Sequence, residues 1–74
     1  MDDTVNMEGV WFVYYFVPHK LEGNTVLTIK GTIRKSDVLS IITNQIYYDK
    51  SDEERTVILS PKNIVIGNLT RIGD

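Results

Sequence analysis

The stretch that decides the fold is Val10-Trp11-Phe12-Val13-Tyr14-Tyr15-Phe16-Val17, an unbroken apolar run. β-Branched and aromatic residues fill it, and both kinds favour strands. The run is too short for a typical isolated helix, and it cannot cross a bilayer as a helix, which needs about 20 residues. We therefore predict a strand over Val10–Val17 that ends at Pro18.

The composition of the whole chain also favours strands. Of its 74 residues, 31 are Val, Ile, Thr, Tyr, Phe or Trp, and there is no alanine, the best helix former. The apolar fraction of 42% and the charged fraction of 24% are ordinary for a globular protein. A chain this short suits one domain, which we place at residues 1–74.

A second strand is expected over Thr25–Arg34, paired with the first in an antiparallel hairpin. Its apolar and polar residues alternate, and Gly31 falls on the apolar face, where a bulge would suit it. Residues 18–24 have loop chemistry, and the polar residues 1–8 are expected to be frayed. The apolar face of this strand consists of Leu27, Ile29 and Ile33.

An amphipathic helix is expected over residues 37–48, with Ser36 as its N-cap. Its apolar side should pack on the apolar face of the second strand, and Thr43 should point away from it. Because β-branched residues weaken helices, a strand through Ile41–Tyr48 is the alternative. The packing positions are Val38, Ile42 and Ile46.

The last third of the chain begins with a charged connector, residues 49–55, in which Ser51 and Glu54 have the spacing of a capping box. We then expect a strand over Thr56–Leu59, a turn over Ser60–Asn63 and a final strand from Ile64 to Ile72. The resulting order is β-β-α-β-β, an α+β fold with one helix packed on one face of an antiparallel sheet. A small all-β barrel is the alternative.

The charge and the residue types of the chain argue against catalytic, cofactor and metal sites. The net charge is −2, there is no cysteine, and His19 is the single histidine, so we expect no catalytic residue, cofactor or metal site, and no enzyme. His19 is expected in a surface loop. The acidic side chains of the connector lack a turning glycine and are expected to be solvated rather than to bind calcium; they are Asp49, Asp52, Glu53 and Glu54. The acidic start Met1-Asp2-Asp3 does not resemble a signal peptide, which predicts a cytoplasmic protein without a membrane segment.

A small single-stranded nucleic-acid-binding domain is the alternative function. Basic side chains beside an aromatic ring on a sheet face can neutralise phosphates and stack bases. The residues that could do this are Lys30, Arg34, Lys35 and Tyr14.

The first strand carries the leading prediction of function, because both of its faces are apolar whereas one helix can cover only one of them. Aromatic surface left in water typically marks an interface, so we predict a non-enzymatic protein-binding module that docks a partner or forms a homodimer. We choose as outward the face whose rings carry polar groups: Trp11, Val13, Tyr15 and Val17. The other face consists of Val10, Phe12, Tyr14 and Phe16.

The aromatic opening Trp11–Tyr15, the hairpin after it and the ending Asn63–Leu69 resemble small bacteriophage accessory proteins of low-GC Gram-positive hosts. That resemblance implies an aromatic first strand, a second strand, a helix and a closing strand. The segment Thr56–Leu59 and the longer connector depart from this pattern. The resemblance implies no catalytic residues; it implies a compact protein that binds a host or phage factor.

Overall fold

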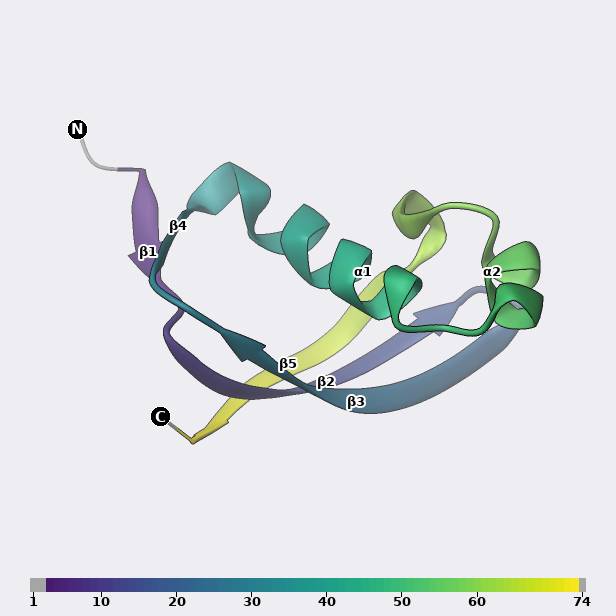
Figure 1. Cartoon of the computed structure of the whole chain (residues 1–74), viewed down its shortest axis with the longest axis horizontal. Coiled ribbons are helices and arrows are strands. Elements are labelled where there is room, and N and C mark those ends of the chain that lie inside the picture. The colour runs from purple at the N-terminus through teal and green to yellow at the C-terminus, as the bar shows by residue number, and fades with distance from the viewer. Residues whose placement is uncertain (1–2, 74) are drawn as a thin grey trace.

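The computed structural model describes residues 3–73, and its centre is strand β2, Gly9–Val17. β2 lies between β3, Leu21–Ile29, and β5, Val65–Gly73, in a three-stranded antiparallel sheet. All helices lie on one side of this sheet (Figure 1). The strand predicted over Val10–Val17 is therefore confirmed, and it is the only strand of this sheet that is paired along both sides.

The hairpin between β2 and β3 is tighter than predicted. The N–H of Lys20 donates to the carbonyl of Val17 at 3.0 Å, and His19 has a φ of 63°. A proline at the second position and a positive φ at the third are typical of a type II turn. The loop predicted over residues 18–24 is wrong beyond Lys20, because the chain is already a strand at Leu21.

The predicted second strand is interrupted at Gly31, whose φ is 82°. The chain turns there into β4, Thr32–Arg34, which leaves the main sheet and pairs with β1, Thr4–Asn6. The prediction of a frayed start is wrong for these residues, since β1 is paired and Met7 is buried. Residues 1 and 2 lie outside the described part of the chain.

The predicted helix is confirmed as α1, Val38–Tyr48, and the alternative strand is wrong. Two of its three predicted packing residues, Ile42 and Ile46, are buried. Two details differ from the prediction. Ser36 does not cap α1, because a short 3-10 turn, η1 (Lys35–Asp37), precedes the helix. Thr43 is buried rather than exposed, and its hydroxyl donates to the carbonyl of Ser40 at 3.2 Å.

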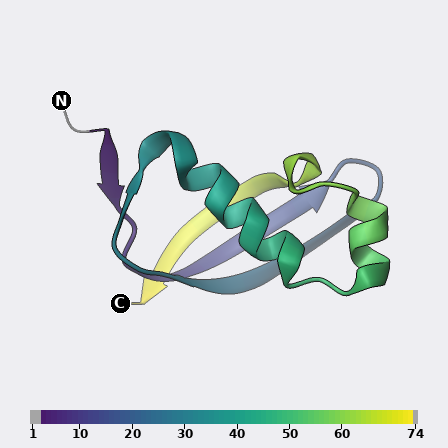
Figure 2. The same cartoon turned by 45° about the horizontal axis from the view of Figure 1, so that its top comes forward.

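The strand predicted over Thr56–Leu59 is wrong, because residues 56–58 belong to helix α2, Asp52–Ile58, and Leu59 ends it. The capping box at Ser51 and Glu54 is present and starts this helix, and Ile58 is fully buried. The capping box at the start of the helix thus outweighs the strand preference of the β-branched residues that follow it. A second 3-10 turn, η2 (Pro61–Asn63), leads into β5 (Figure 2).

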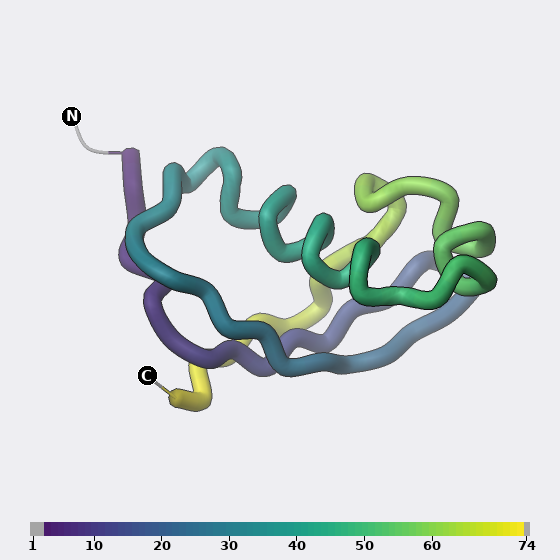
Figure 3. Tube along the Cα trace, viewed as in Figure 1, coloured from purple at the N-terminus to yellow at the C-terminus, as the bar shows by residue number. Residues whose placement is uncertain are grey.

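The core lies between the sheet and the layer formed by α1, α2 and η2 (Figure 3). The class is α+β as predicted, and the described strands form no closed barrel. The order of the elements, however, is β-β-β-β-α-α-β, with two strands more before the helix and one fewer after it than predicted. The fully buried side chains of the core are Val13, Ile42 and Ile58, and Tyr15 and Ile46 are nearly so.

Candidate functional site

The face of β2 that we predicted as outward is the core face. Val13, Tyr15 and Val17 are 0–4% exposed, and Trp11 is half-buried. α1, α2 and Ile64 share this core, so these side chains are not free to bind a partner. The choice of this face was wrong.

The polar groups of the two rings explain the error. We expected the Tyr15 hydroxyl and the Trp11 indole N–H to favour exposure. Instead, Nε1 of Trp11 donates to the carbonyl of Met7 at 2.9 Å, and the ammonium of Lys50 donates to the Tyr15 hydroxyl and lies 4.6 Å from the ring centroid. A ring whose polar group finds a partner at the rim of the core can be buried without an orphaned donor.

The opposite face of the sheet, which we call the open face, is covered by no described element (Figure 1). Along β2 its residues are half-buried, and directly paired residues on the neighbouring strands share the face. Val26 on β3 and Val65 on β5 extend it, with 56% and 40% of their surfaces exposed. The central stripe consists of Val10, Phe12, Tyr14 and Phe16, and the flanks of Glu22, Asn24, Val26, Thr28, Val65, Asn68 and Thr70.

The aromatic rings of the open face are held in place by the backbone of β5. The centroids of Tyr14 and Phe16 are 6.2 Å apart, and their planes are inclined by 36°. Tyr14 pairs with Asn68 and Tyr15 with Ile66, so Gly67 is an extra residue in β5 and forms a bulge directly under the Tyr14 ring. Tyr14 and Phe16 are therefore packed against each other and against the backbone of β5 at Gly67.

A hollow of about 470 Å³ continues the stripe at the hairpin end of the molecule. Tyr14 and Phe16 line one part of it, and residues 17–22, which include the turn and His19, line the rest. His19 lies in the exposed turn, as expected for a surface loop histidine. The hollow extends the stripe to a region that also carries Lys20 and Glu22.

Charge is nearly absent from the open face. Among the described strand residues that belong to it, Glu22 is the one charged side chain, although almost a quarter of the chain is charged. Arg71 belongs to the other face, where its guanidinium lies 5.2 Å from the Trp11 ring. The strand residues of this face suit an apolar partner and offer no cations to phosphates, whereas Lys20 lines the hollow at the hairpin end.

The predicted nucleic-acid set is not brought together. Arg34 is in β4, outside the main sheet, and Lys30 and Lys35 are exposed on either side of that strand. Tyr14 pairs with Asn24, six residues before Lys30, which is about 20 Å along a strand. A phosphate held by these basic residues would therefore lie far from the Tyr14 ring.

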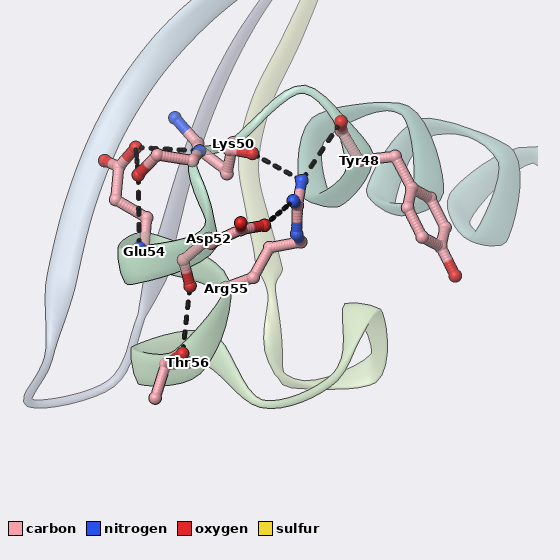
Figure 4. Close-up of polar contacts among 7 residues, drawn as sticks. Tyr48, Lys50, Asp52, Glu54, Arg55 and Thr56 are labelled. Atoms are coloured by element: carbon pink, nitrogen blue, oxygen red, sulfur yellow. Dashed lines mark hydrogen bonds and ion pairs between the residues drawn. The ribbon is translucent and has the colours of Figure 1, made fainter.

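Two of the four acidic side chains of the connector, those of Asp52 and Glu54, make contacts at the start of α2. Asp52 forms an ion pair with Arg55, and the carboxylate of Glu54 accepts the N–H of Ser51 at 3.5 Å (Figure 4). Arg55 also donates to the carbonyls of Lys50 and Tyr48. Within residues 3–73, no three His, Asp or Glu side chains converge as a metal site would require.

No family model, no curated protein and no solved structure matches this chain. Over the part of the chain that the structure describes, no helix is long and apolar enough to cross a membrane.

The open face, rather than the face predicted from the sequence, is the candidate functional site. The register of the hairpin was the missing signal: a three-residue turn pairs Trp11 with Leu27, which places Val13 and Tyr15 on the core side with it.

Proposed function

We propose that this protein is a non-enzymatic protein-binding module whose open face docks an uncharged, apolar surface of another protein. The observation that carries the proposal is the aromatic stripe of β2, which lies uncovered on a face with a single charged residue, Glu22. Rings held rigidly on a sheet bind with little loss of side-chain entropy, and aromatic side chains dominate the energetic centres of interfaces.

In keeping with the resemblance of its strands, we propose a bacteriophage accessory protein that acts in the cytoplasm on a host or phage factor. Single-stranded nucleic acid is the competing ligand, since Tyr14 and Phe16 could stack on bases. The uncharged surroundings of the stripe argue against it, because nucleic-acid binding draws most of its affinity from neutralised phosphates.

Photo-crosslinking tests the proposal. A photoreactive phenylalanine analogue replaces Phe12 on the open face, and in a matched control it replaces Leu39, which is 61% exposed on α1. In lysate of a low-GC Gram-positive bacterium, we expect one protein to be captured from position 12 and not from position 39.

Capture should disappear when Phe16→Ser accompanies the label at position 12, and it should persist after nuclease treatment and at high salt. Equal capture from both positions, or no capture at either, would contradict the proposal. Capture of nucleic acid that weakens steeply with salt would establish the competing function instead.

A further inference from the structure

The two edges of the main sheet are not alike. β5 carries two extra residues relative to β2, one at Gly67 and one between Arg71 and Gly73. Such bulges twist an edge strand and hinder pairing with another chain. β3, in contrast, follows β2 in unbroken register from Leu21 to Ile29, with no bulge and no proline, and with one charged residue.

The outer backbone groups of β3 belong to its even-numbered residues. The carbonyl of Val17 accepts the turn hydrogen bond from Lys20, so Val17 and its partner Leu21 direct their backbone groups toward each other. Alternation along an antiparallel ladder then turns the backbone groups of residues 22, 24, 26 and 28 outward. Within residues 3–73, no strand pairs with this edge of β3, and Figure 2 shows no element along it.

We propose that β3 pairs antiparallel with β3 of a second copy about a twofold axis at Val26, so that two sheets join into one of six strands. Only pairing between outward-directed residues satisfies the free groups, and twofold axes at Thr25 and at Val26 both achieve this; we choose Val26 because of the charges on the two strands. Asn24 then lies opposite Thr28 of the second copy.

Charge favours the same register. With Val26 on the axis, Glu22 of each copy lies opposite Lys30 of the other, and both side chains are exposed. The two Glu22 side chains lie at opposite ends of the paired strands and do not repel each other. Both open faces lie on the same side of the joined sheet, so the dimer presents two aromatic stripes side by side, and its formation does not depend on what binds them.

A charge swap tests the pairing in sedimentation equilibrium with the full chain at micromolar concentrations. Glu22→Lys and Lys30→Glu each replace two attractive pairs by two repulsive ones, so each should raise the dissociation constant about tenfold. The double variant Glu22→Lys/Lys30→Glu should restore the wild-type value. Lys62→Glu, an exposed charge change on η2, should leave it unchanged.

Cysteine crosslinking checks the register, since the chain has no cysteine of its own. Val26→Cys should form a disulfide between copies. Asn24→Cys and Thr28→Cys should do so only when the two variants are mixed.

A protein that stays monomeric at hundreds of micromolar would overturn the proposal. So would a dimer that ignores both charge changes, or one that Phe12→Ser dissociates while the swaps do not. Because the side chains changed in the charge and cysteine variants are all exposed, the melting temperature of each of these monomers should stay within a few degrees of the wild type, which separates lost pairing from lost folding.

Discussion

The ring of Tyr14 rests on the backbone of Gly67, so closely that a Cβ at residue 67 would lie 2.6 Å from Cδ2 of Tyr14. The position of the Tyr14 ring therefore depends on the bulge at Gly67. Tyr14 can lie flat enough to contact Phe16 because the residue beneath it has no side chain.

Gly67→Ala should therefore destabilise the protein by about 1–3 kcal/mol, because the added methyl group forces the Tyr14 ring to move. Chemical denaturation measures the loss. Gly73→Ala on the same strand is the matched control, since its Cβ would lie 3.6 Å from Cβ of Val10, an ordinary contact. Equal losses of stability from the two substitutions would mean that moving the Tyr14 ring costs no free energy.

Ile42→Ala should destabilise the protein by about 2–5 kcal/mol, because Ile42 is fully buried between α1 and the sheet. Asn44→Ala, two residues further along the helix and exposed, should change stability by less than about 0.5 kcal/mol. Thermal and urea denaturation of both variants measure the difference. Similar losses at the two positions would contradict the helical packing described here.

Ser51→Ala should cost about 1 kcal/mol, because it removes the acceptor of the Glu54 N–H at the start of α2. Ser36→Ala is the informative control. The sequence predicts a cap at Ser36, whereas in the structure Ser36 is an exposed residue of η1 that caps nothing, so its loss should be close to zero. A larger loss of stability from Ser36→Ala than from Ser51→Ala would contradict the finding that Ser36 does not cap α1.

Two exposed leucines should respond to glycine with opposite signs. Leu59 ends α2 with a φ of 75°, a conformation that L-residues disfavour, so Leu59→Gly should stabilise the protein by about 1 kcal/mol. Leu39 is in α1, where glycine costs about 1 kcal/mol. Melting temperatures that shift in opposite directions would confirm the prediction, and a loss at both positions would refute it.

The sequence predicted the three longest apolar segments well. The aromatic run became β2, the amphipathic stretch became α1, and the final apolar segment became β5. The class follows from these three elements, because a helix with one apolar side needs a sheet to cover.

The errors arose where local signals competed. At Thr56–Leu59, β-branched residues predicted a strand, but the capping box at Ser51 had already committed the chain to a helix. The sequence shows both the capping box and the β-branched residues. Over so few residues, hydrophobic periodicity cannot tell which of the two determines the structure.

The candidate site depended on register, which periodicity does not contain. A strand that is apolar on both faces gives no sign of which face is buried. The partners that satisfy the Tyr15 hydroxyl and the Trp11 N–H on the core side are Lys50 and Met7, and only the folded chain reveals these contacts.

The central position of β2 also determines the order in which the strands of the main sheet pair during folding. Its pairing with β3 closes a three-residue turn and should form within microseconds, whereas Phe16 must find Val65 and Val10 must find Gly73 across most of the chain. We expect β5 to dock after the folding barrier, so that substitutions within it speed unfolding and leave the folding rate almost unchanged. Until it docks, β2 is a half-paired aromatic strand, and that interval is when newly made chains are most prone to aggregate.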